Sequence, residues 1–203
     1  GTQFIGCQTH DHGCSIEFSS NGNVHHCNAR VLVNAAGPWV NQVLSRIDCG
    51  MPGCAIEMVQ GAHMVMAGSG ERGIYYLEAP LDGRGVFVMP WQGKALVGTT
   101  ETSYHNDPDD VAPLESELEY LANVVGHFFP NLAAVKEPAD QTAFAGLRVL
   151  PSGNGSAHGR SRQVLLHADH ADRPRVLTIY GGKLTAYRHT AEQVLDRLRK
   201  VLP

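Results

Sequence analysis

The strongest constraint in this sequence is a pattern that occurs twice: an apolar strand leads into glycine, and the start of a helix follows. The first copy is VLVNAAGPW at residues 31–39, and the second is TIYGGKLTAYR at residues 178–188. Small residues let a ligand approach the backbone, while the unpaired N–H groups and the dipole of a helix N-terminus attract negative charge. A tight packing turn between strand and helix explains the first copy equally well, so both interpretations stay open.

The second copy carries a lysine, which favours an anionic ligand. Gly181 and Gly182 permit close approach of a ligand, and Thr185 supplies a hydroxyl at the helix start. The helix dipole repels Lys183, so a nearby anion would relieve an unfavourable arrangement. We therefore expect Lys183 to face a ligand, whereas Arg188, farther along the helix, is expected to form a surface ion pair.

The remaining patterns predict an α+β fold with a mixed or antiparallel sheet flanked by helices. A hairpin is predicted over 14–27, with its turn at Asn21-Gly22. Further strands are predicted at 30–36 (covered on both faces), 56–60, 63–66, 74–77, 85–90, 95–100, 143–150, near 164 and at 176–180. Helices are predicted from Gly37-Pro38 to about Asp48, from Pro113 to just before Pro130, and at the C-terminus. The apolar stripes of the last two comprise Leu114, Leu118, Leu121, Val125 and Phe128, and Leu184, Tyr187, Ala191, Val194 and Leu198.

Two charged or polar side chains interrupt apolar strands. Arg148 lies within the apolar stretch 144–150, where burial of a guanidinium is costly unless an anion pairs with it. That anion is either a carboxylate of the protein, which is the commoner case, or a substrate phosphate. His63 begins an apolar strand, and a lone histidine there is more often a hydrogen-bonded core residue than a catalyst. A separate acidic stretch ahead of the second helix is expected to form a solvated loop rather than a calcium site; it comprises Glu101, Asp107, Asp109 and Asp110.

Composition excludes several classes of protein. With 16 basic and 20 acidic residues spread along the chain, no basic patch for nucleic acid is present. No apolar run is long enough to span a bilayer. Five irregularly spaced cysteines predict a reducing, cytoplasmic setting and no metal site. The segment GSGERG at 68–73 matches the spacing of a dinucleotide fingerprint, but a strand and not a helix is predicted after it. The segment GNGSAHG at 153–159 has the wrong spacing for such a site and is predicted to be a loop.

Several blocks together resemble one family. They are VLVNAAGPWV at 31–40, QGAHMVM at 60–66, MPW at 89–91, VGTTE at 97–101, AGLRVLP at 145–151 and YGGKLTAYR at 180–188. In this order they resemble the FAD-dependent glycerol-3-phosphate dehydrogenases, within the broader D-amino-acid-oxidase-like flavoproteins. The GGKLT block is the most specific, whereas the NAAGPW block is shared across the broader group. The resemblance covers most of the chain from residue 30 onward.

The resemblance assigns roles to particular residues. It implies that Ala36, Gly37, Trp39, Gly181, Gly182, Leu184 and Thr185 contact FAD. Lys183 and Arg148 match positions that face the substrate, and His63 matches an active-site histidine that would accept the proton of the substrate hydroxyl. The two glycine-bearing strand ends, around Gly37 and Gly181, are then expected to converge on one flat cofactor.

The implied reaction is oxidation of glycerol 3-phosphate to dihydroxyacetone phosphate, with hydride passing to the flavin and electrons to quinone. The partners are then a small phosphorylated polyol and a quinone, in the cytoplasm, with peripheral association at the inner face of the membrane left open. We expect residues 1–48 to be part of an FAD-binding, Rossmann-like portion, 49–145 to form the substrate domain, and 146–203 to return to the FAD portion. Since the N-terminal FAD-binding unit of the family is missing, we expect this chain to be an inactive fragment.

Two other functions remain open at this stage. A related flavin oxidase of an amino acid or 2-hydroxy acid would use Arg148 to bind a carboxylate instead of a phosphate. The lysine of the GGKLT block favours phosphate. A binding module that keeps the fold without the chemistry is the alternative from another class.

Overall fold

The computed structural model describes residues 1–68, 73–130, 142–152 and 164–202. The chain divides into two compact units, one formed by Gly1–Glu57 with Val149–Pro203 and the other by Met58–Arg148. The boundaries expected from the sequence lie after residues 48 and 145. The segments 69–72 and 153–163, which include most of the two glycine-rich segments singled out above, lie outside the described residues.

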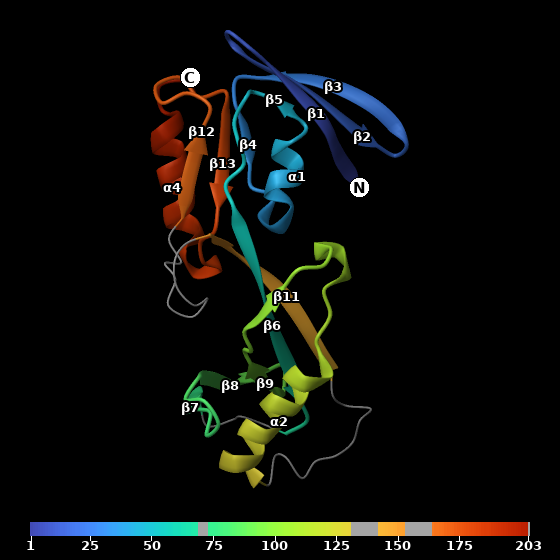
Figure 1. The fold of residues 1–203 in the computed structure, drawn as a ribbon, viewed down its shortest axis with the longest axis vertical. Coiled ribbons are helices and arrows are strands. Elements are labelled where there is room, and N and C mark those ends of the chain that lie inside the picture. Colours follow the sequence, from blue (N-terminus) through green and yellow to red (C-terminus); the bar gives the residue numbers. More distant parts are fainter. Residues whose placement is uncertain (69–72, 131–141, 153–163, 203) are drawn as a thin grey trace. The chain divides into compact units, whose positions relative to one another are not determined.

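The first unit contains a four-stranded sheet in the order β3-β2-β1-β5 (Figure 1). Its strands are β1 (Thr2–His10), β2 (Gly13–Ser20), β3 (Asn23–Ala29) and β5 (Ile47–Asp48). The predicted hairpin is confirmed, because Asn21 and Gly22 have φ angles of 50° and 78° and connect antiparallel β2 and β3. A small core beneath this sheet is formed by Cys7, Cys14, Leu44, Ile47 and Val176.

A second, three-stranded sheet of the same unit carries both glycine junctions. Its order is β12-β13-β4, with β4 (Leu32–Asn34) parallel to β13 (Val176–Tyr180) and β12 (Leu165–Ala168) antiparallel to β13. After β4 come the 3-10 helix Gly37–Trp39 and the short helix α1 (Val40–Leu44). After β13 come the 3-10 helix Leu184–Ala186 and α4 (Tyr187–Leu198), whose Val194 and Leu198 pack on Leu177.

The second unit is a predominantly antiparallel sheet with one helix against it. The sheet has the order β10-β6-β9-β8-β7, and β11 pairs with β6. Its strands are β6 (Ile56–Met66), β7 (Tyr75–Glu78), β8 (Gly85–Trp91), β9 (Lys94–Gly98), β10 (Thr102–Tyr104) and β11 (Thr142–Pro151). Helix α2 (Glu115–Phe128) buries Leu121, Val124 and Val125 in one core with alternate residues of the strands, such as Met64 and Val97. This arrangement leaves the opposite face of the sheet to other side chains, His63 among them.

Four local predictions need correction. The helix predicted to reach Asp48 ends at Leu44, because Ile47 and Asp48 pair with β1 as a strand. The strands predicted at 56–60 and 63–66 are one strand, β6, which continues through Gly61. The strand predicted to be covered on both faces has 38% of Val33 exposed. The predicted apolar stripes are exposed at their ends, with exposed fractions of 47% for Leu114, 42% for Phe128, 88% for Leu184 and 70% for Tyr187.

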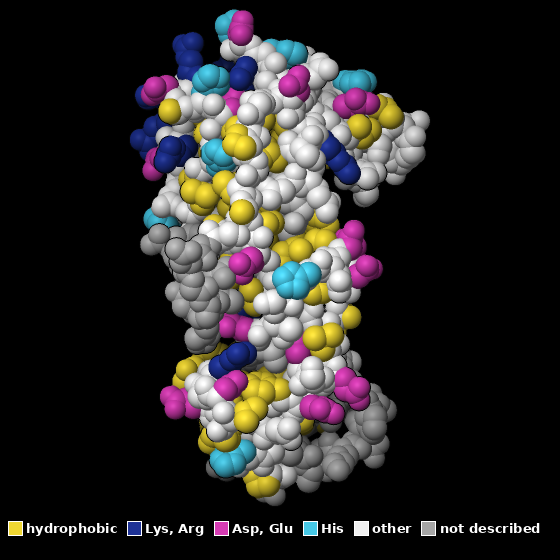
Figure 2. All heavy atoms as spheres, in the orientation of Figure 1, with side chains coloured by type: hydrophobic (Ala, Val, Ile, Leu, Met, Phe, Trp, Pro, Cys, Tyr) yellow, Lys and Arg dark blue, Asp and Glu magenta, His cyan; other side chains and the backbone are white. Residues whose placement is uncertain are grey.

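Charge is unevenly spread over the surface. On the face shown in Figure 2, most Lys and Arg side chains (dark blue) gather at the end that carries α4, whereas Asp and Glu side chains (magenta) occur over the whole face. Among the described helices, none combines the length and the apolar character needed to cross a bilayer.

Candidate functional site

The two glycine junctions lie side by side in the first unit. In the parallel pairing of β4 with β13, Leu32, Val33 and Asn34 face Val176, Leu177 and Thr178. Parallel strands end at the same edge of a sheet, so the chain leaves both strands at one place (Figure 1). Gly37 follows β4 after two residues, and Gly181 follows β13 directly.

The backbone at these junctions adopts conformations that favour glycine. Gly37, Gly181 and Gly182 have φ angles of 56°, 70° and 94°, in the left-handed region where other residues are strained. A hollow of about 690 Å³ lies beside the junctions, between the strand ends and α4. Most of its lining is apolar or backbone; it includes Val33, Ala35, Ile179, Gly181, Gly182, Lys183, Leu184, Tyr187, Thr190, Ala191, Val194 and Leu195.

Hydrogen bonds from buried polar side chains stabilise the backbone at both glycine junctions. The Asn34 side chain, 2% exposed, donates from Nδ2 to the Val40 carbonyl at 2.9 Å and accepts from the Ala36 N–H at 3.3 Å. The Tyr180 hydroxyl donates to Asn41 Oδ1 at 2.9 Å and accepts from the Cys54 N–H at 3.2 Å. These hydrogen bonds fix the backbone that leaves each strand. In the sequence, Asn34 is recognisable as the one polar residue in an apolar strand.

The remaining residues predicted for this site are exposed or half-buried. Lys183 is the exposed cap of the 3-10 helix that precedes α4, and no hydrogen bond or ion pair of its side chain is found with the described part of the chain. Thr185 is exposed, and Ala36 and Trp39 are half-buried. Arg188 pairs with Glu192 at 3.2 Å on the surface of α4.

The second unit brings His63 and Arg148 to one face of its sheet. His63 lies on β6, and its ring stacks on that of Phe144 in β11, with the ring centres 5.2 Å apart. Arg148 lies four residues after Phe144 on the same strand, so the two side chains share a face. Helix α2 packs on the other face, where Met64 and Val97 are buried.

Two glycines make room for these side chains. A Cβ atom on Gly61 would lie 2.5 Å from Thr99 Oγ1 and 2.7 Å from Arg148 Nη2. Gly98 pairs directly with His63 across β9 and β6, and a Cβ atom on Gly98 would clash with the imidazole ring. Glycine within a strand marks close approach of another group. Here the group is the imidazole in one case and the guanidinium in the other.

Arg148 has a carboxylate partner in the protein. Its Nη1 lies 2.7 Å from Glu101 Oε1, and its Nη2 donates to Thr99 Oγ1 at 3.2 Å and to the Thr100 carbonyl at 3.4 Å. The side chain of Glu101 is only 13% exposed, so it does not belong to a solvated loop as predicted. Sequence reasoning missed this residue, although an arginine in an apolar strand implies a nearby carboxylate.

The surroundings of His63 favour its neutral form. Its pKa falls below the usual value because half-burial disfavours the charged imidazolium, and the positive charge of Arg148 adds to this effect. A neutral imidazole can accept a proton at its free ring nitrogen. The geometry thus combines a proton acceptor with a fixed cationic hydrogen-bond donor.

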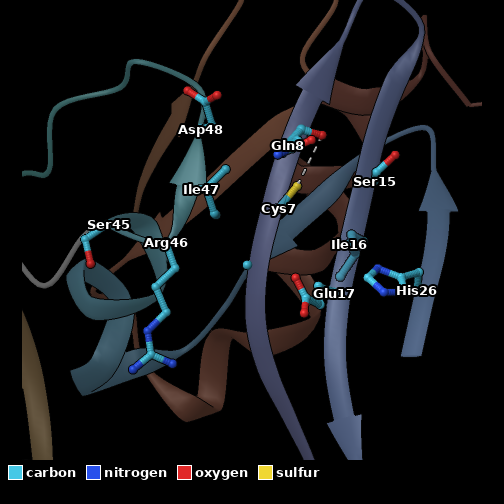
Figure 3. A pocket seen from close by; sticks show the side chains of 11 residues that line it. Cys7, Gln8, Ser15, Ile16, Glu17, His26, Ser45, Arg46, Ile47 and Asp48 are labelled. Carbon is cyan, nitrogen blue, oxygen red and sulfur yellow. Dashed lines mark hydrogen bonds between the residues drawn. The ribbon is translucent and has the colours of Figure 1, made fainter. Parts of the chain in front are cut away.

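A second hollow of the first unit, about 600 Å³, contains none of the predicted site residues (Figure 3). Cys7, Gln8, Ser15, Ile16, Glu17 and His26 line it from the strands, and Ser45, Arg46, Ile47 and Asp48 from the chain after α1. Arg46 already donates to the Phe4 carbonyl at 3.2 Å. Burial raises the pKa of the Cys7 thiol to about 12, so Cys7 stays protonated. No reactive group therefore stands out in this hollow.

Comparison with known proteins identifies relatives along nearly the whole chain. The family model described as "FAD dependent oxidoreductase" (DAO) matches residues 2–188. A D-erythritol 1-phosphate dehydrogenase from Brucella abortus is 30% identical over 91% of this chain and 37% of its own length. A glycerol-3-phosphate dehydrogenase from Pseudomonas aeruginosa is 37% identical over 89% of this chain and 35% of its own length. The chain thus spans about a third of the length of these relatives.

A solved structure shares the fold. The glycerol-3-phosphate dehydrogenase from Bacillus halodurans, complexed with FAD, superposes on 98% of this chain and 38% of its own with a TM-score of 0.78 and 26% identity. An L-alpha-glycerophosphate oxidase from Mycoplasma pneumoniae with FAD bound superposes with a TM-score of 0.66 at 15% identity, which supports the fold alone. By the match over residues 2–188, this chain belongs to the DAO family of FAD-dependent oxidoreductases.

Proposed function

We propose that this chain is part of an FAD-dependent dehydrogenase of a phosphorylated polyol, with glycerol 3-phosphate oxidised to dihydroxyacetone phosphate. The observation that carries the proposal is the placement of His63 and Arg148 on one sheet face, where Gly98 and Gly61 make room for their side chains. Both the Brucella and the Pseudomonas relatives are named for oxidation of a polyol phosphate. His63 then accepts the hydroxyl proton, and Arg148 donates hydrogen bonds to the substrate.

The glycine junctions of the first unit fit FAD. Gly37, Gly181 and Gly182, whose positive φ angles favour glycine, place no side chain at this edge, and the adjacent hollow is largely apolar, as a flat ring system requires. Ala36, Trp39, Leu184 and Thr185 would complete the contacts. FAD supplies the hydride acceptor when it is bound. Lys183 is exposed beside these junctions, where its charge can attract the phosphate of the substrate.

The wider setting is also part of the proposal. Electrons pass from the flavin to quinone, and the protein is cytoplasmic with peripheral association at the inner face of the membrane. Because residues 1–203 cover about a third of the relatives' length, we propose that this segment alone is inactive and holds FAD weakly or not at all. Stoichiometric flavin absorbance in the purified segment would contradict that part.

The test follows bleaching of the flavin in the whole protein without oxygen. Glycerol 3-phosphate and erythritol 1-phosphate are expected to bleach the flavin, whereas glycerol is not. His63→Gln should slow bleaching by at least about 100-fold with little change in substrate affinity, the size expected for a lost general base. Reduction by an amino acid or a 2-hydroxy acid, but by neither polyol phosphate, would refute the assignment.

A further inference from the structure

Glu101 forms an ion pair with Arg148, the arginine that binds the substrate in the proposed function. Its Oε1 lies 2.7 Å from Arg148 Nη1, and the side chains are 13% and 32% exposed. An ion pair this sheltered from water interacts more strongly than a surface pair. Part of the donor capacity and of the charge of Arg148 is thus taken up by the protein itself.

The carboxylate is held in place by its neighbours. The Thr100 hydroxyl, 6% exposed, accepts from the Ala62 N–H at 2.8 Å and donates to Glu117 Oε1 at 2.7 Å. The Thr102 hydroxyl also donates to Glu117 Oε1, at 2.7 Å. Residues on both sides of Glu101 are therefore tied to α2 through one buried carboxylate. These bonds restrain the backbone that carries Glu101 beside Arg148.

The guanidinium is fixed from the other side as well. Thr99 Oγ1 and the Thr100 carbonyl accept from Nη2, and Gly61 lies so close that a methyl group there would meet it at 2.7 Å. These contacts hold the guanidinium in one orientation. A substrate group bound by Arg148 also lies near the carboxylate of Glu101.

We propose, on the basis of the proposed function, that Glu101 is a positioning residue that also sets specificity, by disfavouring substrates with a carboxylate on the carbon that bears the reacting hydroxyl. When the hydroxyl lies next to His63, such a carboxylate is attached to the reacting carbon itself. It would then bind Arg148 at the place where the carboxylate of Glu101 already lies. The phosphate of glycerol 3-phosphate is separated from that carbon by a methylene and an oxygen, and the proposed function has Lys183 attract it, so it need not bind Arg148 beside Glu101. Like charges at this range repel. This would separate polyol phosphates from 2-hydroxy acids.

Two matched ligands test the idea in the flavin-loaded whole protein. Glycerol 3-phosphate and 3-phosphoglycerate differ in that one terminal CH₂OH is replaced by a carboxylate. Glu101→Gln should tighten inhibition by 3-phosphoglycerate about tenfold, the effect of removing one like charge at a partly exposed site, while the KM for glycerol 3-phosphate changes less. Glu119→Gln, an exposed carboxyl on α2, should leave both constants unchanged.

The remaining outcomes separate the two proposals. An unchanged ratio of the two constants in Glu101→Gln overturns the role of Glu101, even if glycerol 3-phosphate still reduces the flavin. Failure of the wild type to oxidise any polyol phosphate instead overturns the proposed function. Should Glu101→Gln not fold, Glu101→Asp keeps the charge but retracts it by a methylene. It should retain the discrimination with a KM raised several-fold, and constants identical to the wild type would overturn the proposal.

Discussion

Glu117 should make the second unit sensitive to acid, and the structure gives the size and the sign of the effect. The side chain is 4% exposed, and its two oxygens accept four hydrogen bonds. Thr100 and Thr102 donate to Oε1, each at 2.7 Å, and Gln60 Nε2 and the Leu114 N–H donate to Oε2 at 2.5 and 3.0 Å. Burial alone raises the pKa of Glu117, but these hydrogen bonds outweigh it and the pKa lies below its usual value.

The direction of the pH dependence follows from the lowered pKa. The ionised carboxylate stabilises the fold fully above the pKa of the unfolded chain, ordinarily 4.5, and this contribution is lost as the pH falls through the folded pKa. Glu117→Gln keeps the shape, and its amide nitrogen can donate to the two threonine hydroxyls. We expect it to cost about 1–2 kcal/mol at pH 7, and Glu117→Leu, which leaves several donors unpaired, about 3–5 kcal/mol.

Urea unfolding followed by tryptophan fluorescence measures these costs. The protein has two tryptophans, Trp39 in the first unit and Trp91 in the second, so a Trp39→Phe background reports on the second unit alone. The gap in unfolding free energy between this background and the same background carrying Glu117→Gln should narrow from pH 7 to pH 3. The control substitution Glu119→Gln should leave the unfolding free energy unchanged. A gap that stays constant or widens on acidification would refute the reasoning.

Three further changes have defined outcomes. Gly98→Ala should displace the His63 ring and lower the rate of flavin reduction at least tenfold in the whole protein, since small misplacements of a catalytic group are costly. An unchanged rate would show that the imidazole of His63 does not lie against Gly98 in the active enzyme. Asp169→Asn removes the ion pair with Arg175 Nε at 2.8 Å and should lower the unfolding free energy of the first unit by about 1–2 kcal/mol at pH 7, measured by Trp39 fluorescence. Hydrogen bonds and Arg175 lower the pKa of Asp169 despite its burial, so the difference from the wild type should fade below pH 4. Tyr180→Phe removes two hydrogen bonds, one to Asn41 Oδ1 and one from the Cys54 N–H, and should lower the unfolding free energy of the first unit by about 1–3 kcal/mol in the same measurement.

The sequence predicted best where local pattern and tertiary role agree. Strand β13 was predicted to the residue, and the hairpin turn at Asn21-Gly22 follows from the positive φ angles that both residues adopt. The helix after Gly37 was predicted too long. Its last residues, Ile47 and Asp48, pair with β1, which lies far earlier in the chain. A local apolar pattern cannot show that a distant strand competes for the same backbone groups.

The errors around Arg148 have one common cause. Gly61 was interpreted as part of a turn between two strands, and Glu101 as part of a solvated loop, each from its immediate neighbours. In the structure β6 continues through Gly61 because the guanidinium of Arg148 occupies the space where a side chain would lie, and Glu101 balances its charge. An arginine in an apolar strand requires both a carboxylate and room for its planar group. Gly61 supplies the room and Glu101 supplies the carboxylate. The glycine within a strand and the sheltered acid, which have no explanation when each is considered alone, are thus both explained by one partly buried arginine.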